Sequence, residues 1–300
     1  MKRGLLLAVA LIATSESAWG QARLTPWGHP NLGGYWDYRT ITPLERPLEL
    51  LDTPVLAEDE AQLFEQEFND RRAIEGDYDE DRGFRLIAGR TSLIVNPVDG
   101  RIPFIDPAVR ARRLGQRGRP RGTESYQQRG ITERCISRSS FPRTPTLYNN
   151  FYQIFQTPDH VVIYSEMIHD ARIIPLNRQP HIDPKIGLLY GDARGHWENT
   201  TLVVETTNFT GTLGTLRFGW SDNLHLVERL TPQEDGTISY EFTIDDPTVF
   251  TQPWTVQIPL KRFEGPLYEY ACHEGNDGLP GILEVSRNLE KLAGESFTTR

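Results

Sequence analysis

Apolar and polar residues alternate along several short segments of the chain, most regularly between residues 224 and 262. The apolar side chains take every second position, at Ile238, Tyr240, Phe242 and Ile244 and again at Trp254, Val256, Ile258 and Leu260. The positions between them are mostly polar. Successive side chains of a strand point to opposite faces, so this pattern predicts strands with one buried and one solvated face.

Shorter apolar runs between turn residues predict further strands. They cover residues 34–38, 93–95, 102–105, 147–156, 161–164, 171–176, 202–204, 224–230 and 267–272. Asp99-Gly100 lies between two of these runs and predicts a hairpin that joins 93–95 to 102–105. Many short strands at close spacing predict an all-β fold, an antiparallel β-barrel of the calycin or lipocalin type, with a β-sandwich as the alternative.

One or two short helices are expected outside the sheet. Residues 54–74 follow a capping residue, Thr53, carry acidic residues in the first turns and place apolar residues on one face. A second short helix is expected to begin near Pro107 and to run toward Gly115.

The first twenty residues have the pattern of a secretory signal peptide. Lys2 and Arg3 precede an apolar stretch, and small residues stand at Ala18 and Gly20 before a cleavage point. An uncleaved N-terminal anchor is the alternative. No later segment has the roughly 18 uninterrupted apolar residues of a membrane span. The mature protein is therefore expected to be soluble and either periplasmic or secreted.

The sequence predicts four parts of the chain. They are the signal peptide (1–20), an N-terminal arm and helix packed outside the barrel (21–83), the barrel domain (84–290) and a C-terminal tail (291–300). No internal repeat and no linker after residue 84 indicates a further division.

Acidic residues outnumber basic ones, 41 to 32, which argues against nucleic acid as a partner. Cleavage of the signal peptide would remove two basic residues and one acidic residue, which takes the net charge from −9 to −10. One segment is locally basic. Its ten arginines are Arg110, Arg112, Arg113, Arg117, Arg119, Arg121, Arg129, Arg134, Arg138 and Arg143. We interpret it as a solvated loop, with an anion-binding flap as the alternative.

Cys135 and Cys272 are the two cysteines of the chain. Export leads to an oxidising compartment, where an even cysteine count favours a disulfide over a free, nucleophilic thiol. The bond would connect the arginine-rich segment to the last predicted strand region.

An acidic residue interrupts one of the apolar faces. Glu228 shares its strand face with Leu226 and Leu230, and an inward carboxylate is costly unless it is paired or functional. Glu228 is therefore either half of a buried ion pair, with Arg172 or Arg262 as its partner, or a catalytic group.

Four motifs resemble those of a family of exported bacterial proteins whose function is mostly unknown. They read EMIHDARIIP (166–175), GDARGHWE with LVVETTNF (191–198 and 202–209), HLVER (225–229) and YEYACHEGN (268–276). The resemblance covers about residues 25–285. The chain departs from the family at residues 198–200, where relatives usually read EGDT, and this affects only a turn. The resemblance implies kinship and carries no activity with it.

The candidate catalytic residues are expected to surround one cavity. They are Glu166, His169, Asp170 and Glu228. The candidate ligand-binding residues around them are Arg172, His196, Trp197, Arg229 and Tyr240. A carboxylate beside an imidazole or a phenol can move protons to and from carbon, and Trp197 would stack on a planar ligand. A turn capped by His169 and Asp170 is the structural alternative.

Two classes of function remain open. The first is a cofactor-free periplasmic enzyme of the lyase, isomerase or cyclase type that acts on a small, partly apolar molecule. The alternative is a non-catalytic periplasmic protein that binds a small hydrophobic or anionic ligand. The sequence has no dinucleotide motif and no metal-ligand spacing such as HExxH, so neither a cofactor nor a metal is expected. The oligomeric state is left open.

Overall fold

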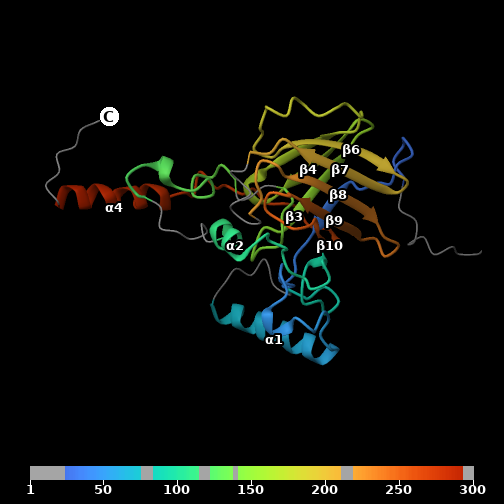
Figure 1. Cartoon of the computed structure of the whole chain (residues 1–300), viewed down its shortest axis with the longest axis horizontal. Coiled ribbons are helices and arrows are strands. Elements are labelled where there is room, and N and C mark those ends of the chain that lie inside the picture. The colour runs from blue at the N-terminus through green and yellow to red at the C-terminus, as the bar shows by residue number, and fades with distance from the viewer. Residues whose placement is uncertain (1–23, 76–83, 115–121, 138–140, 211–218, 293–300) are drawn as a thin grey trace, which may run out of the picture.

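Antiparallel strands form the body of the molecule (Figure 1), which confirms the expected all-β class. The computed structural model describes residues 24–75, 84–114, 122–137, 141–210 and 219–292. The predicted signal peptide, most of the C-terminal tail and four of the ten arginines lie outside these ranges, the four being Arg117, Arg119, Arg121 and Arg138.

Ten strands are present in the described ranges. They are β1 (Gly34–Asp37), β2 (Ile94–Asn96), β3 (Phe151–Gln156), β4 (His160–Ser165), β5 (Ala171–Pro175), β6 (Asp192–Glu198), β7 (Thr201–Thr207), β8 (His225–Pro232), β9 (Ile238–Asp245) and β10 (Trp254–Phe263). Their hydrogen-bonded order is β5-β4-β3-β1-β10-β9-β8-β7-β6, and β2 pairs with β10 off this path.

β10 joins two halves of the sheet. Its residues 254–260 pair with β9, whereas residues 261–263 pair with β1. The hydrogen-bonded path ends at β5 and β6, so the sheet is not closed. These two edge strands nevertheless come together through side chains, because a Cβ atom on Gly195 of β6 would lie 2.9 Å from Ile174 of β5.

The alternating segments bury the face that the sequence predicts. The alternating apolar positions of β9 (238–244) and β10 (254–260) are all buried, and so are Leu226, Glu228 and Leu230 of β8. The apolar members of this set join apolar side chains of β3, β4 and β7 in one core. Each Å² of apolar surface removed from water contributes about 25 cal/mol, so a pattern of period two decides which face of each strand turns inward.

Two predicted strands are absent. Residues 102–105 form an isolated bridge between Phe104 and Phe250, because their backbone groups bond to the 249–251 turn. The hairpin predicted at Asp99-Gly100 is therefore wrong, and β2 pairs with β10 instead. Residues 267–272 are irregular chain that leads into a turn.

Three α-helices lie outside the sheet in the described ranges: α1 (Glu58–Glu75), α2 (Pro107–Leu114) and α4 (Gly278–Leu292). Helix α1 begins later than predicted because the residues before it pair with another segment. Val55 forms a β-bridge with Arg90, and the Leu56 amide donates to the Gly89 carbonyl. Helix α4, which was not predicted from the sequence, projects away from the sheet (Figure 1). None of the helices in the described part of the chain is long and apolar enough to span a membrane.

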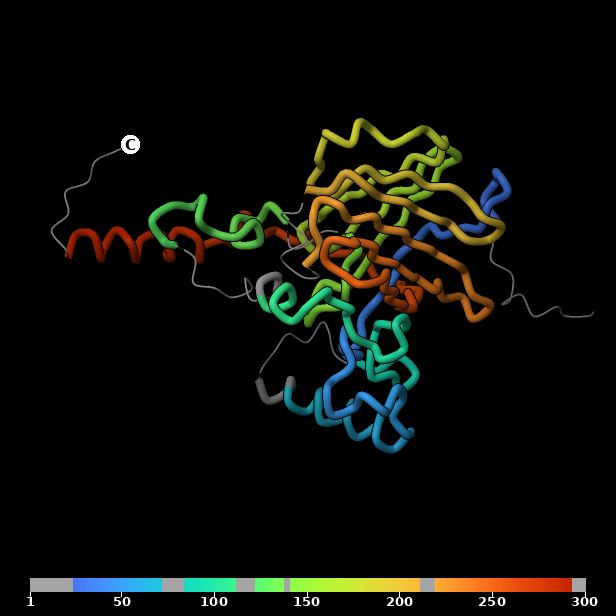
Figure 2. The backbone as a smooth tube through the Cα atoms, viewed as in Figure 1, coloured from blue at the N-terminus to red at the C-terminus, as the bar shows by residue number. Residues whose placement is uncertain are grey.

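The N-terminal arm belongs partly to the sheet rather than lying wholly outside it. Strand β1 is hydrogen-bonded between β3 and β10. From β1 the chain continues to α1, at the end of the molecule opposite β6 (Figure 2). The arm therefore connects the sheet to a smaller lobe that contains α1.

Candidate functional site

Glu228 of β8 is held by a buried ion pair. Its carboxylate lies 2.5 Å from Nη2 of Arg172 on β5, and the Tyr240 hydroxyl on β9 donates to it at 2.6 Å. Arg172 also donates to the hydroxyl of Thr206 on β7 at 2.6 Å. Since β5 and β8 are far apart in the strand order, this contact requires the sheet to curl until its inner faces meet. The ion-pair interpretation of Glu228 holds, with Arg172 rather than Arg262 as the partner.

Burial and the charge of Glu228 set the protonation states of Arg172 and Tyr240. Burial lowers the pKa of the Arg172 guanidinium, but the charge of Glu228, its hydrogen bond and the nearby Tyr240 and Tyr152 together raise it by more, so the net pKa is raised. Burial, and then the charge of Glu228, raises the pKa of Tyr240 well above its ordinary value. Tyr240 is therefore a neutral donor and Arg172 a fixed cation near neutral pH, and neither is suited to exchange protons with a substrate.

A second buried ion pair stands at the start of β5. Asp170 pairs with Arg143, and the Tyr190 hydroxyl donates to Ser137 at 2.8 Å nearby. Burial raises the pKa of the Asp170 carboxyl, and the Arg143 guanidinium opposes this rise. Burial also raises the pKa of Tyr190. Arg143 is 3% exposed, so the assignment of the whole arginine-rich segment to a solvated loop is wrong at this residue.

Phe141 connects the two ion pairs. The guanidinium carbons of Arg143 and Arg172 lie 5.2 and 5.6 Å from the centre of its ring, which is a cation–π distance. Sequence reasoning missed Phe141, because no alternating pattern surrounds it. We call this group the interior network, and its members are Phe141, Arg143, Asp170, Arg172, Glu228 and Tyr240.

The centre of the curled sheet is filled by protein side chains. The space between them is too narrow for a water molecule, and it is bounded by Phe141, Tyr152, Ile154, Ile163, Leu230, Tyr240 and Leu260. Small-molecule sites usually need about 300–1,000 Å³. The side chains that bound this space therefore leave no room for a ligand between them.

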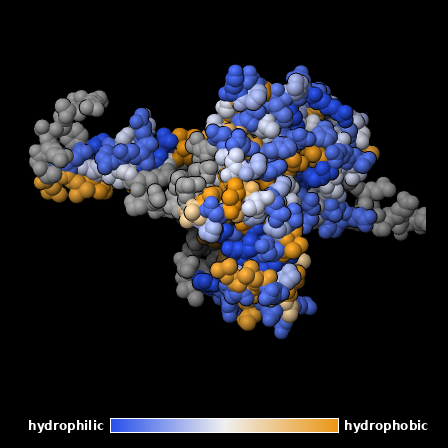
Figure 3. All heavy atoms as spheres, in the orientation of Figure 1, coloured by the Kyte–Doolittle hydropathy of each residue, from blue (hydrophilic) through white to orange (hydrophobic). Residues whose placement is uncertain are grey.

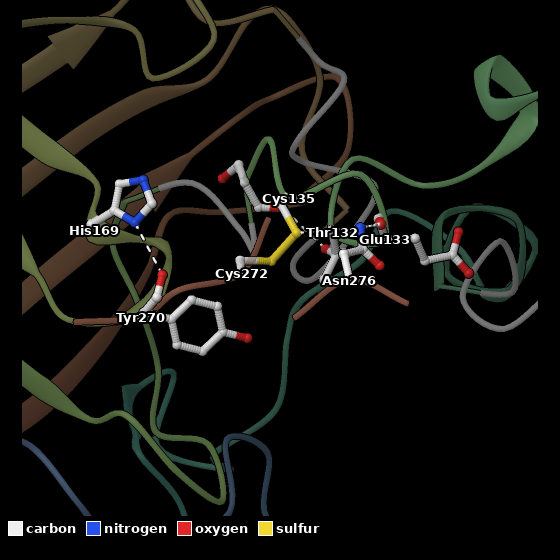
Figure 4. Close-up of a disulfide and its surroundings, with 8 residues drawn as sticks. Thr132, Glu133, Cys135, His169, Tyr270, Cys272 and Asn276 are labelled. Atoms are coloured by element: carbon white, nitrogen blue, oxygen red, sulfur yellow. Dashed lines mark hydrogen bonds between the residues drawn. A yellow bond between two sulfur atoms is a disulfide. The ribbon is translucent and has the colours of Figure 1, made fainter. Parts of the chain in front are cut away.

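His169 lies on a strained turn between β4 and β5. The φ angles of Ile168 and His169 are 61° and 46°, and a β-branched residue rarely adopts this left-handed conformation. Ile168 is buried, whereas the imidazole of His169 is exposed, with Nδ1 3.2 Å from the carbonyl oxygen of Tyr270 (Figure 4). His169 is thus at the surface and does not join the interior network.

Glu166 is buried at the beginning of the same turn. Its backbone amide donates to the Phe151 carbonyl at 3.1 Å. Burial, and then the charges of Glu269 and Glu166, raises the pKa of Tyr164, so both carboxylates lie near this phenol. Of the four predicted catalytic residues, the structure thus brings Asp170 and Glu228 into one network and leaves Glu166 and His169 on the turn.

His196 and Arg229 lie on an exposed face. The Glu198 carboxylate is 2.6 Å from Arg229 and 3.2 Å from Nε2 of His196, and the hydrogen bond from Arg229 is the main cause of the lowered pKa of Glu198. Trp197 stacks on His29 with ring centres 4.9 Å apart and planes 9° apart. The stacking position expected for a planar ligand is therefore taken by a residue of the N-terminal arm.

Cys135 and Cys272 form the predicted disulfide (Figure 4), across a sequence separation of 137 residues. Next to it, the Asn276 side chain donates to the Glu133 carbonyl at 2.8 Å. The bond therefore anchors the chain that leads into α4 and holds Tyr270 close to His169.

An open cleft lies between the N-terminal arm, α1 and the 144–147 segment. Its volume is about 290 Å³, close to the lower limit for a small-molecule site. It is lined by Thr40, Ile41, Thr42, Pro43, Leu44, Phe68, Phe84, Leu93, Thr144, Pro145, Thr146 and Leu147. We call it the arm cleft. Apolar residues also gather on the surface of this end of the molecule (Figure 3).

No sequence pattern predicts the arm cleft. Its lining comes from separate segments around residues 40–44, 68, 84, 93 and 144–147, and none of them has an unusual composition. No signal short of the folded arrangement would have grouped them.

No three histidine, cysteine or acidic side chains in the described ranges are arranged to hold a metal ion. Comparison with protein-family models finds none that matches the chain, and comparison with curated proteins finds no match.

Proposed function

We propose that the protein binds a small, partly apolar molecule in the arm cleft and does not catalyse a reaction on it. The observation that carries the proposal is a cleft of about 290 Å³ with mostly apolar walls. Among the described residues, those that line it have no acidic, basic, histidine or tyrosine side chain. None of these lining residues could perform acid–base chemistry on a molecule bound there.

An exported location is part of this proposal. A disulfide is favoured in an oxidising compartment such as the periplasm, and Cys135 and Cys272 are joined. The signal-like first twenty residues and the resemblance to exported bacterial proteins support the same location. The net charge of −9 supports a small molecule, rather than nucleic acid, as the partner.

We also propose that the sheet is a variant of the calycin-like barrel. The contact between Gly195 of β6 and Ile174 of β5 supports this, as does the ion pair that joins β5 to β8 across the interior. In such a barrel, the edge strands β5 and β6 are brought together by side chains rather than by backbone hydrogen bonds.

An enzyme of the lyase, isomerase or cyclase type is the second candidate. The strained turn at Ile168 and His169 favours it, because backbone strain of this kind gathers at active sites. It ranks second because Glu228, the acid expected to complete the site, is engaged with Arg172 and Tyr240.

Titration with N-phenyl-1-naphthylamine, a neutral dye that fluoresces in apolar surroundings, tests the binding proposal. Leu147 lines the cleft and is 49% exposed, so Leu147→Trp should fill part of the space without disturbing the core. We expect the affinity for the dye to fall by about tenfold, which corresponds to about 1.4 kcal/mol.

The matched control is Leu289→Trp on α4. Leu289 is 59% exposed, and no residue of α4 lines the cleft, so the substitution adds the same side chain outside the cleft lining. Its dye affinity should equal that of the wild type. Equal affinity in both variants would contradict binding in the arm cleft.

A further inference from the structure

Threonine hydroxyls are the polar side-chain groups in the lining of the arm cleft. Three of these hydroxyls form hydrogen bonds with backbone groups of the protein. Thr40 donates to a backbone carbonyl at 2.7 Å, Thr42 accepts from a backbone amide at 2.8 Å, and Thr146 donates to a backbone carbonyl at 2.6 Å. These hydroxyls hold the arm and the 144–147 segment in shape.

Thr144 differs from the other three. The residue is 2% exposed, and its Oγ1 has no hydrogen-bond partner among the described residues. Buried hydroxyls are nearly always bonded, because an unpaired one has lost its bonds to water without replacement. Thr144 lines the cleft, but its Oγ1 has almost no accessible surface in this conformation. Rotation about χ1 would turn the unpartnered hydroxyl toward a bound molecule, as a donor or as an acceptor.

The lining that the described residues form offers no charge to balance an ionic ligand. The guanidinium next along the chain, that of Arg143, is already paired with Asp170 in the interior network. An isolated charge in apolar surroundings is costly. The cleft therefore favours a neutral molecule over an anion or a cation.

Two aromatic rings form one wall of the cleft. Phe68 of α1 and Phe84 meet edge to face, with ring centres 5.8 Å apart and planes 63° apart. Leu44, Leu93 and Leu147 line the same space. Flat rings pack well against such a surface, because aromatic groups add edge-to-face and offset contacts to apolar burial.

We propose that the ligand is a compact, neutral aromatic molecule whose single hydroxyl or carbonyl oxygen bonds to Thr144. This inference rests on the proposed binding function and names the class of molecule that the cleft takes. The aromatic wall selects the ring, the uncharged lining excludes ionised groups, and Thr144 orients the oxygen.

Displacement of N-phenyl-1-naphthylamine by three probes of one skeleton tests this inference. The probes are naphthalene, 1-naphthol and 1-naphthoate. We expect 1-naphthol to bind about fivefold more tightly than naphthalene, the effect of one hydrogen bond, and 1-naphthoate to bind more weakly than either. Thr144→Val keeps the side-chain shape and should abolish the preference for 1-naphthol.

Thr146→Val is the matched control. It also removes a hydroxyl from the lining, but one that bonds to a backbone carbonyl. We expect it to lower the thermal midpoint and to retain the preference for 1-naphthol. Thr144→Val should unfold no earlier than the wild type, because no protein hydrogen bond of Thr144 is lost.

The outcomes separate the inference from the function on which it rests. A preference for 1-naphthol that survives Thr144→Val overturns the role of this hydroxyl, and tighter binding of 1-naphthoate overturns the neutral class. Equal affinity for all three probes also contradicts the inference while the binding function stands. If no probe displaces the dye and Leu147→Trp leaves dye binding unchanged, the binding function itself fails.

Discussion

The interior network and the arm cleft differ in what each lacks. The network gathers Arg143, Asp170, Arg172 and Glu228 in ion pairs around Phe141, but the space beside it is too narrow for water. The arm cleft has about 290 Å³ of open space, but no charged side chain lines it in the part of the chain that the structure describes. Residue types typical of catalysis thus mark the place where this fold buries charge, and the place where a molecule fits has ordinary apolar residues and threonines.

The largest expected effect is a loss of stability when an ion pair of the interior network is broken. Glu228→Gln removes one charge of a pair whose side chains are 4% and 1% exposed, which leaves the Arg172 guanidinium buried without a counter-charge. We expect the free energy of unfolding to fall by about 3–5 kcal/mol, measured by urea denaturation. The folded variant should bind N-phenyl-1-naphthylamine as the wild type does, because Glu228 does not line the cleft.

A double variant sharpens this prediction. Arg172→Met combined with Glu228→Gln removes the stranded cation and should recover part of the lost stability. If Glu228→Gln alone had unchanged stability and weaker dye binding, the interior network would contribute to binding rather than to stability. That result would contradict the separation of the interior network from the arm cleft.

An intermediate loss of stability is expected when Glu45 is replaced. This residue lies on the N-terminal arm, next to the arm cleft. Its carboxylate accepts two hydrogen bonds from Arg110 of α2, at 2.6 and 2.8 Å, and one from the Ile102 amide at 3.1 Å. Burial raises the pKa of Glu45, but these partners lower it by more, and the net pKa lies below the ordinary 4.5. Glu45→Gln should therefore lower the free energy of unfolding near pH 7 by about 1–2 kcal/mol.

The pH dependence gives the sign of this contribution. A carboxyl with a lowered pKa in the folded state binds fewer protons there than in the unfolded state, so its stabilisation is fully present above about pH 4.5 and is lost as the pH falls through the lowered pKa. The difference between wild type and Glu45→Gln in urea denaturation should shrink over this acid range. A difference that stays constant down to about pH 3 would contradict the charge-based explanation.

The smallest effect on stability and on dye binding is expected when Arg229 is replaced. Its ion pair with Glu198 is exposed, with side chains 41% and 46% accessible, and solvent screens such pairs. Arg229→Ala should leave the thermal midpoint and dye binding within experimental error. A clear loss of dye binding would move the ligand site to the outer face of β6 and β8.

Much of the strand arrangement was predictable because its signal is local. In β8, β9 and β10 the buried face follows from alternation alone, and Glu228 could be placed inward on the same evidence. The prediction was wrong at the turn after β2, where Asp99-Gly100 is a good hairpin signal but β10 pairs with β2 instead. Turn chemistry brings neighbouring strands together only when no distant strand competes for their backbone groups.

The candidate site was less predictable, because its contacts are long-range. Trp197 could be recognised as a stacking residue, yet nothing near it in the sequence indicates that His29 takes the stacking position. Arg143 reads as one member of a charged run, and only its burial beside Asp170 separates it from the others.

The sequence by itself determined the all-β class, the inward faces of β8 to β10 and the pairing of Cys135 with Cys272. These properties follow from period-two burial and from the presence of two cysteines, and both can be read without knowing which strands are neighbours. The tertiary structure alone decided that Arg172 neutralises Glu228 and that distant segments enclose the arm cleft. The physical reason is that charge pairing and open volume depend on the distances between segments, which chain folding sets and which local residue patterns do not encode.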